Sequence, residues 1–323
     1  MTIDEFNNKM NNPLRYGFTT GTAATAAALA AAYLYLKTPK RFVDVSIPYG
    51  IDLTVPIEYM EIKNNLYICG VIKHSGDDPD VTDGVLISAG LEFLKEECDI
   101  LEFSFFAGEG VGIVTRDGLP VTKGEAAINP VPRRMICDHL RKILNKHCFK
   151  GRVNITIMVK GGKEIAKKTF NERLGIVGGI SILGTSGLVS PMSKSALLQS
   201  IETDIKFRIK NSKNSIVYMS PGNMGATYLE KNFGIDSSKV ALISNFIGES
   251  IDYSVSNDAK GIVLCGDMGK LIKLSGGIMN THSNDSDCRL ELLSNAVFKS
   301  FYKNSDTKLL NDTMEGILSQ NTT

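Results

Sequence analysis

The hydrophobic and polar positions of the first half predict a buried helix followed by an antiparallel sheet. An alanine-rich run over residues 22–36 has high helix propensity, and Thr19, Thr20 and Gly21 supply capping residues just before it. From residue 42 onward, β-branched and aromatic residues recur in short runs, which is typical of strands. We expect strands at residues 43–47, 52–60, 66–73, 99–106 and 111–115, and a helix over residues 86–97.

The second half changes to short apolar strands that alternate with helices. Helical spacing over residues 132–145 ends before a new strand at Val153, so a domain boundary is expected near Phe149. Further strands are expected at residues 176–183, 215–219, 240–244 and 261–265, and helices at 193–210, 225–233 and from about 248. This alternation predicts a parallel sheet. We therefore expect an α+β domain with a mainly antiparallel sheet over residues 1–149 and an α/β domain with a mainly parallel sheet over residues 150–323.

Charge and composition exclude several classes of function. The chain has 36 basic and 35 acidic residues and a net charge of +1, so nucleic acid is not an expected partner. No apolar run approaches the roughly 20 residues that span a bilayer, so a membrane is not expected either. The six cysteines lie far apart without a C-x-x-C pair, which fits a cytoplasmic protein and gives no support for a protein-bound metal.

Glycine-bearing loops follow the apolar strands of the second half, at residues 183–187, 220–225 and 265–270. In an open parallel sheet such loops share the edge formed by the carboxyl ends of the strands, where small molecules bind. The alternative is that each glycine closes a tight turn. None of the loops matches the dinucleotide fingerprint or the Walker phosphate loop, so NAD and ATP are not indicated. The three loops together favour a ligand pocket.

Carboxylates are concentrated over residues 73–84, at the end of an expected strand. Their spacing does not match a calcium loop. The segment is either a solvated loop of Asx turns or a set of hydrogen-bond acceptors with a base for a carbon acid. Glycines and prolines over residues 108–133 fix an unusual backbone path, which proteins mostly keep for turns or ligand contacts.

Arg116, Arg133 and His282 lie in or beside these unusual segments. The arginines could bind carboxylates bidentately, although an exposed arginine is more often a surface charge. His282 follows the last glycine loop and is either a structural histidine or a side chain at the rim of a pocket.

Seven blocks follow one another along the chain. They are LRYGFTTGT at residues 14–22, GDDPDVT at 76–82, GVGIVT at 110–115, AINPVPR at 127–133, TFNERLGI at 169–176, GGISILGTSG at 178–187 and IMNTHS at 278–283. Taken in order, these motifs resemble the cobalt-precorrin-5B (C1)-methyltransferase family over roughly residues 13–303. Ala23 stands where many members carry cysteine, so a thiol there is not required, and Leu29 stands where a lysine is usual. Asn284 begins a segment that differs from the arginine-containing version expected of the family.

The resemblance implies transfer of a methyl group from S-adenosylmethionine to C1 of cobalt-precorrin-5B, giving cobalt-precorrin-6A in anaerobic cobalamin biosynthesis. The cobalt belongs to the substrate, so no metal site of the protein is expected. The acetate and propionate arms of this tetrapyrrole call for cationic groups. The implied substrate contacts are Arg15, Thr19, Thr20, Arg116, Arg133 and Arg173. The implied S-adenosylmethionine contacts are Gly184, Thr185, Ser186, Gly187, Gly222, Asn223 and Gly225. Asp77, Asp78 and His282 are the candidates to take up the proton released at C1.

Two alternatives remain open at this point. A carrier could bind corrinoid intermediates without turning them over, or the glycine loops could hold another nucleotide-like ligand of an acyl or phosphoryl transferase. The sequence is also compatible with a homo-oligomer and with handover of the substrate from other enzymes of the pathway.

Overall fold

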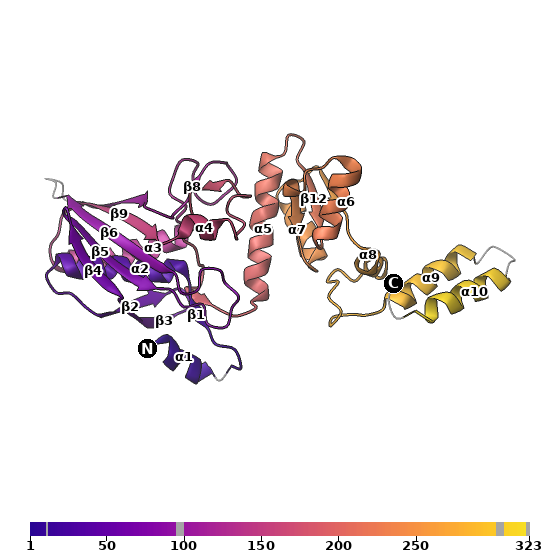
Figure 1. Ribbon diagram of the computed structural model, residues 1–323, viewed down its shortest axis with the longest axis horizontal. Helices are drawn as coiled ribbons and strands as arrows, with labels where there is room; N and C mark the ends of the chain where they lie inside the picture. Colours follow the sequence, from indigo (N-terminus) through magenta and orange to yellow (C-terminus); the bar gives the residue numbers. More distant parts are fainter. Residues whose placement is uncertain (11, 95–99, 302–306, 321–323) are drawn as a thin grey trace. The chain divides into compact units, whose positions relative to one another are not determined.

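The computed structural model describes residues 1–10, 12–94, 100–301 and 307–320. The chain divides into two compact units, unit 1 (Met1–Ser193) and unit 2 (Lys194–Thr323) (Figure 1). This division falls later than the boundary expected near Phe149. The reason is that β9 (Gly151–Val159) forms hydrogen bonds inside the sheet of unit 1, a long-range pairing that local sequence patterns do not reveal.

Unit 1 is built on a five-stranded sheet with the order β4-β5-β6-β9-β7. Its pairs are antiparallel except for β7 and β9, which are parallel, so the expected mainly antiparallel sheet is confirmed. The sheet also shows where several predicted strands lie. Its members are β4 (Tyr59–Lys63), β5 (Leu66–Ile72), β6 (Leu86–Leu94), β7 (Leu101–Ala107) and β9.

The predicted helix over residues 86–97 is wrong, because residues 86–94 form β6 in the middle of this sheet. Ile87, Ala89 and Leu91 are fully buried, and Ser88 and Gly90 between them are buried as well, so both faces of this strand are covered. Pairing with β5 on one side and β9 on the other overrides the local preference. The end of the predicted helix, residues 95–97, and the start of the strand predicted at Asp99 lie outside the described residues.

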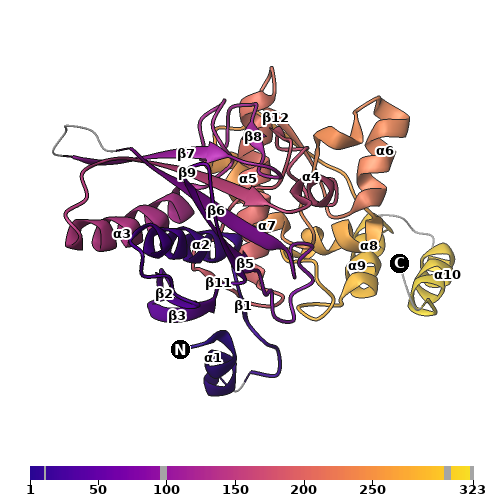
Figure 2. The same ribbon diagram turned by 60° about the vertical axis from the view of Figure 1, so that its left-hand side comes forward.

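Two helices, α2 (Thr20–Tyr35) and α3 (Pro130–Lys146), pack beside the sheet of unit 1 (Figure 2). The predicted alanine-rich helix is thus confirmed, and Thr19 is its N-cap. Its alanines from Ala23 to Ala32 are completely buried, because small side chains let the helix lie close to β5, β6 and α3 at once. The remaining elements of the N-terminal region are α1 (Ile3–Met10), β1 (Gly17–Phe18) and the hairpin of β2 (Phe42–Ile47) and β3 (Ile51–Pro56).

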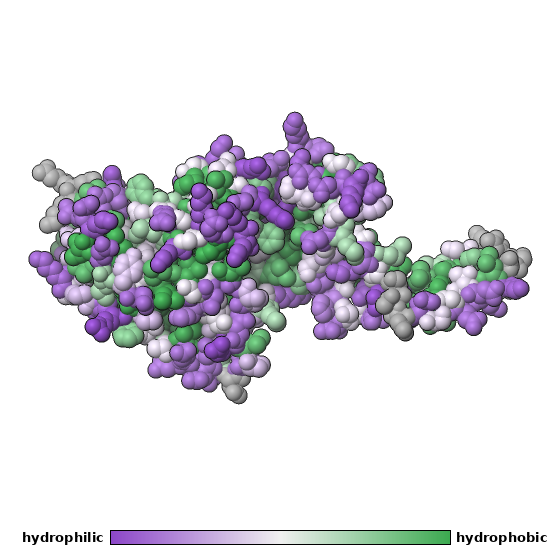
Figure 3. Space-filling model, viewed as in Figure 1, coloured by the Kyte–Doolittle hydropathy of each residue, from purple (hydrophilic) through white to green (hydrophobic). Residues whose placement is uncertain are grey.

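An irregular part of unit 1 contains short strands and one short helix, α4 (Gly162–Ala166). β8 (Ile113–Val114) pairs with β10 (Ile176–Val177), and β1 pairs with β11 (Leu188–Val189). The strand predicted over residues 176–183 is therefore shorter than expected, although isolated bridges continue it at Ile180 and Ile182. On the visible face of unit 1, hydrophilic residues are interrupted by hydrophobic ones (Figure 3).

Unit 2 contains a parallel three-stranded sheet with the order β13-β12-β14, as the alternating pattern predicted. The strands are β12 (Ile216–Ser220), β13 (Val240–Leu242) and β14 (Gly261–Leu264). The helices are α5 (Lys194–Asn211), α6 (Asn223–Phe233), α7 (Ile247–Ser256), α8 (Met268–Leu271), α9 (Arg289–Phe301) and α10 (Thr307–Leu318), and the 3-10 turns are η1 (Ser237–Lys239) and η2 (Ile272–Gly276). No helix in the described part of the chain has both the length and the apolar character that crossing a membrane requires.

Candidate functional site

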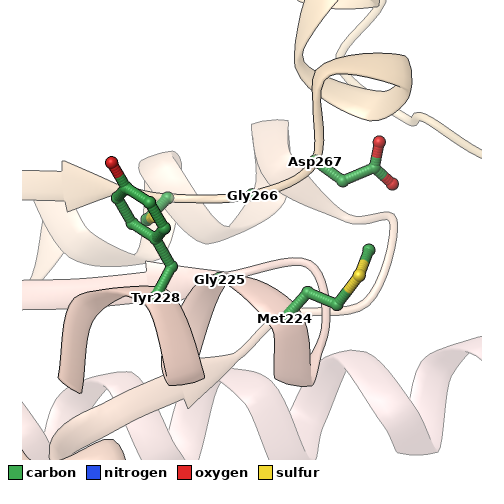
Figure 4. Close-up of a pocket in the computed structure, with 6 residues that line it drawn as sticks. Met224, Gly225, Tyr228, Gly266 and Asp267 are labelled. Carbon is green, nitrogen blue, oxygen red and sulfur yellow. The ribbon is translucent and has the colours of Figure 1, made fainter. Parts of the chain in front are cut away.

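A pocket of about 240 Å³ lies at the carboxyl edge of the parallel sheet in unit 2 (Figure 4). One wall is the start of α6, which follows β12, and the other is the loop that follows β14. The side chains of Met224 and Asp267 extend from these two walls (Figure 4). This position is the expected one for a ligand in an open α/β sheet. The pocket is lined by Met224, Gly225, Tyr228, Cys265, Gly266 and Asp267.

Two glycines at the start of α6 have different roles. A Cβ at Gly225 would collide with the carbonyl oxygen of Cys265 and with Oγ of Ser220, so glycine lets α6 lie directly against the neighbouring loop. A Cβ at Gly222 would meet nothing within 4 Å. Gly222 therefore leaves the backbone open to an approaching molecule.

The polar and aromatic groups of this pocket suit a nucleoside-like ligand. Among the described residues no side chain caps the first turn of α6, which leaves its N–H groups to solvent or a ligand. One oxygen of Asp267 accepts a hydrogen bond from the Gly269 N–H at 2.8 Å, and its carboxylate is exposed. Tyr228 is 54% exposed and offers a ring face to a flat base. The fit of S-adenosylmethionine to these residues is chemically reasonable, since the ligand carries a purine, hydroxyls and cationic groups.

The loop at residues 183–187 follows no strand of the parallel sheet of unit 2, so the expectation that all three glycine loops follow strands of one sheet is wrong. The loop belongs to unit 1, where it is bound to the start of α2. The Gly21 N–H donates to the Leu183 carbonyl, and the Thr20 hydroxyl both donates to that carbonyl and accepts from the Leu183 N–H. A Cβ at Gly184 would collide with Thr19.

The structure thus brings together two groups of residues that the resemblance assigned to different ligands. Thr19 and Thr20 are buried and lie against Gly184 and Gly187, with the Thr19 N–H donating to the Gly187 carbonyl at 3.0 Å. Thr185 is exposed on the same loop, and Ser186 donates to the Leu188 carbonyl. These contacts serve the fold of unit 1, and ligand contacts of this loop remain a prediction.

In the acidic segment, most carboxylates already have partners. Asp77 accepts hydrogen bonds from the backbone N–H of Arg15 at 2.7 Å and from its guanidinium at 2.8 and 3.0 Å. The side-chain hydrogen bonds of Arg15 lower the pKa of Asp77, and its backbone bond and charge act in the same direction. Asp77 is therefore a weak base.

Asp78 is less engaged than its neighbours. One of its oxygens accepts a hydrogen bond from the Met192 N–H at 3.1 Å. Asp80, by contrast, forms an ion pair at 2.8 Å with Lys73, whose side chain is only 1% exposed, and Asp83 accepts from the Ser75 N–H at 2.7 Å. The loop is thus largely a structural network, with Asp78 as its most available carboxylate.

The four predicted arginines fall into two groups. Arg15 is held by Asp77, and Arg133 is held by the Ile128 and Ala126 carbonyls at 2.7 and 3.1 Å and by Glu125 at 2.8 Å. Arg116 and Arg173 are exposed, and no salt bridge of the described chain engages either guanidinium. Arg173 lies over the ring of Phe170, with 5.7 Å from the guanidinium carbon to the ring centroid.

His282 is exposed in unit 2, in the turn that follows η2. Its Nδ1 accepts a hydrogen bond from the Asn284 N–H at 3.1 Å. Because this bond uses the lone pair of Nδ1, a neutral ring carries its proton on Nε2 and presents a donor to solvent. This geometry favours a hydrogen-bonding role over that of a base.

Sequence reasoning missed Tyr228 as a pocket residue. Its position three residues after Gly225 on an amphipathic helix places both on the same face, which is the signal that would have found it. In the described part of the chain, no three His, Cys, Asp or Glu side chains group so that they could hold a metal ion.

Comparison with known proteins gives consistent matches. The chain matches the CbiD family over residues 7–191. It is 46% identical over 293 residues to the cobalt-precorrin-5B C(1)-methyltransferase of Ruminiclostridium cellulolyticum, which covers 90% of this chain and 75% of the relative. The protein of the same name from Methanocaldococcus jannaschii is 42% identical over 282 residues, covering 87% of this chain and 76% of the relative.

Among solved structures, the crystal structure of the cobalamin biosynthesis protein (cbiD) from Archaeoglobus fulgidus is 31% identical, with a TM-score of 0.45, and the match covers 85% of this chain and 84% of that one. The family match extends over more than half of the chain, and the relatives above are more than 40% identical over most of its length. On these grounds the chain belongs to the CbiD family.

Proposed function

We propose that this protein transfers a methyl group from S-adenosylmethionine to C1 of cobalt-precorrin-5B, giving cobalt-precorrin-6A. The observation that carries the proposal is the 46% identity, over 90% of this chain, to a cobalt-precorrin-5B C(1)-methyltransferase. The ligand pocket at the sheet edge of unit 2 supports it, because a methyltransferase needs a site for its donor.

The pocket of unit 2 is our proposed site for S-adenosylmethionine, which supplies a methyl group activated by the positive charge on sulfur. Gly222 leaves the backbone at the start of α6 open toward the ligand, Asn223 begins the helix beside it, and Gly225 lets α6 lie against the loop that follows β14. Tyr228 provides the face for the purine, and the Asp267 carboxylate accepts from hydroxyl or ammonium groups. The protein contributes alignment, since displacement at an activated methyl needs no covalent intermediate with the enzyme.

For the tetrapyrrole, Arg116 and Arg173 are the two of the four predicted arginines whose guanidinium groups are available to carboxylate arms. Arg15 and Arg133 are occupied by protein acceptors, so their contribution is to hold the loops in place. We propose Asp78 as the acceptor of the proton released at C1, because Asp77 is paired with Arg15 and His282 presents a donor.

The donor site is tested by thermal denaturation with S-adenosylhomocysteine, ATP and acetyl-CoA. We expect S-adenosylhomocysteine to raise the melting temperature of the wild type, and the Tyr228→Ala variant to need more ligand for the same shift. Stabilisation by ATP or acetyl-CoA alone would contradict the proposal. Transfer of a labelled methyl group distinguishes an enzyme from a carrier, because a carrier binds the tetrapyrrole and leaves it unlabelled.

A further inference from the structure

A loop of unit 2, residues 278–286, covers the start of α7. The carbonyl oxygen of Met279 accepts hydrogen bonds from the N–H groups of Ile247 and Gly248 at 3.1 and 3.2 Å, which satisfies two donors at the start of this helix. A Cβ at Gly248 would lie 2.7 Å from the Cβ of Met279, so glycine lets the two segments touch. The start of α7 is therefore covered by protein, whereas no described side chain caps the first turn of α6.

The same loop is joined to the residues that follow β13. The Thr281 N–H donates to the Asn245 carbonyl at 2.9 Å, and the Asn245 side-chain amide donates to the side-chain oxygen of Asn280. Asn280 and Phe246 also form an isolated β-bridge. Because Asn245 and Phe246 come after the carboxyl end of β13, the loop lies at the same edge of the parallel sheet as the pocket of unit 2.

The buried ammonium of Lys273 holds this loop from inside unit 2. Lys273 is 2% exposed, and its Nζ donates to the Thr281 carbonyl at 3.0 Å and to the Ser286 carbonyl at 2.6 Å. In the described part of the chain no carboxylate forms an ion pair with it. Burying a charge without a counter-charge is costly, and such departures from good packing are expected at functional sites. The position of the loop is therefore a feature to explain by function.

His282 stands in the exposed turn between the two carbonyls that Lys273 holds. The Asn284 N–H donates to its Nδ1, and the N–H groups of Asp285 and Ser286 donate to its carbonyl at 3.1 and 3.2 Å. These bonds fix the turn and occupy Nδ1, so a neutral ring carries its proton on Nε2. The loop thus presents one defined side-chain donor, the Nε2–H of His282, to an approaching ligand.

The pocket of unit 2 and this loop belong to neighbouring strands of one sheet. The pocket lies between the start of α6, which follows β12, and the loop that follows β14, and the strand order is β13-β12-β14. Neighbouring strands are about 4.8 Å apart, so the residues that follow β13 begin about one strand spacing beyond β12. An extended ligand whose purine lies at Tyr228 can therefore reach along the edge toward His282.

The amino-acid half of the methyl donor carries a carboxylate that the pocket itself does not match. The six lining residues include no cation, and the one charged side chain among them is the carboxylate of Asp267. Asp267 suits the ammonium or the hydroxyl groups of the ligand, and it repels a second carboxylate. The carboxylate of the ligand therefore needs a donor from beyond the lining.

We infer that the Nε2–H of His282 donates to this carboxylate of the methyl donor, and that Lys273 is the residue that positions His282. The inference rests on the proposed function for the identity of the ligand. His282 is then a binding residue, and Lys273 acts on it through the backbone of the loop without touching the ligand. Because a hydrogen bond to a charged group is stronger than one between neutral groups, this contact contributes to affinity.

The test compares two ligands by calorimetric titration of the full-length protein. S-adenosylhomocysteine has the amino-acid half, whereas 5′-methylthioadenosine lacks it and keeps the purine, the ribose and the sulfur. His282→Ala is expected to weaken S-adenosylhomocysteine binding about tenfold and to leave 5′-methylthioadenosine binding unchanged, because only the first ligand has a carboxylate. His282→Gln, whose side-chain amide also donates, is expected to recover part of the loss.

The positioning role of Lys273 has its own readout. Lys273→Met is expected to weaken S-adenosylhomocysteine binding about as much as His282→Ala does, again without a change for 5′-methylthioadenosine. The double variant should show no further loss, because both changes remove the same hydrogen bond. Circular dichroism checks that each variant is folded at the titration temperature. Lys273→Gln keeps a shorter donor and should show a smaller loss of the same kind, which provides a second variant if the methionine does not fold.

Two control variants separate this loop from general effects. Lys260→Met removes an exposed lysine directly before β14, at the opposite edge of the same sheet. His147→Ala removes an exposed histidine at the end of α3 in unit 1. Both controls are expected to bind the two ligands like the wild type.

The outcomes distinguish this inference from the proposed function. Unchanged S-adenosylhomocysteine binding in His282→Ala, equal losses for the two ligands, or equal losses in the controls would overturn the inference and leave the pocket as the site of the methyl donor. A loss in His282→Ala without one in the Lys273 variants would reject the positioning role. A wild type that binds neither ligand would reject the site of the methyl donor itself, and the inference with it.

Discussion

The buried ion pair of Lys73 and Asp80 gives the most quantitative prediction. The Lys73 side chain is 1% exposed, and its ammonium lies 2.8 Å from a carboxylate oxygen of Asp80, whose side chain is 25% exposed. Asp80→Asn keeps an acceptor for the N–H and hydroxyl of Thr82 but leaves the ammonium without a counter-charge. Removing one member of a buried pair costs about 3–5 kcal/mol, and the partial exposure of Asp80 reduces this to about 2–4 kcal/mol.

The measurement is thermal and urea denaturation followed by circular dichroism. With roughly 2–4 °C per kcal/mol for a unit of this size, Asp80→Asn should lower the melting temperature of unit 1 by about 5–15 °C. Asp83→Asn is the matched control, because it removes a charge from the same loop and keeps the acceptor for the Ser75 N–H. Adding Lys73→Met to Asp80→Asn should recover most of the loss.

The same pair predicts a pH dependence. Burial by itself raises the pKa of Asp80, but the charge of Lys73 and the hydrogen bonds from Lys73 and Thr82 outweigh it and lower the pKa below 3.8. A lowered pKa in the folded state means that the stabilisation is complete above the unfolded value and is lost as the pH falls through the folded value. The difference between wild type and Asp80→Asn should therefore shrink in strong acid. A loss below about 1 kcal/mol at neutral pH, or one equal to that of Asp83→Asn, would refute the reasoning.

Three further substitutions test the two units. Gly225→Ala should lower the melting temperature of unit 2 and weaken S-adenosylhomocysteine binding together, because the new Cβ collides with the Cys265 carbonyl and displaces α6. A thermal scan and a calorimetric titration that find the melting temperature and the binding unchanged would contradict this packing. Arg133→Gln should destabilise unit 1 by about 1–3 kcal/mol in urea denaturation, because the Ile128 carbonyl loses a charged donor. A loss of tetrapyrrole binding at unchanged stability would instead make Arg133 a ligand contact. Asp78→Asn should lower kcat about 100-fold with little change in KM if Asp78 takes the proton, and an unaltered kcat would remove it from the mechanism.

Local patterns were sufficient for the elements whose partners are close in sequence. The helix α2 followed from its alanines and from Thr19 as cap, and the parallel sheet of unit 2 followed from the alternation of apolar strands and helices. Both signals are carried by short stretches of chain, so no knowledge of long-range contacts was needed.

Long-range pairing explains what the sequence did not predict. The sequence of β6 alone predicted a helix, and its pairing with β5 and β9 makes it a strand. The division after Ser193 likewise depends on a long-range pairing, because β9 joins a sheet formed mostly by earlier strands. The loop at residues 183–187 has the same glycine signal as the loop at 220–225, yet its partner is the start of α2. A glycine in such a loop indicates from sequence that another group can approach the backbone closely, but the sequence does not distinguish a ligand from another part of the protein.

The most direct test of the account is mass spectrometry of the purified protein incubated with S-adenosylmethionine and cobalt-precorrin-5B generated in situ, followed by carbon-13 NMR of the product made from labelled donor. The account predicts that the tetrapyrrole gains one methyl group and that the label lies on C1. A tetrapyrrole that binds but keeps its mass, or a label on another atom, would contradict it.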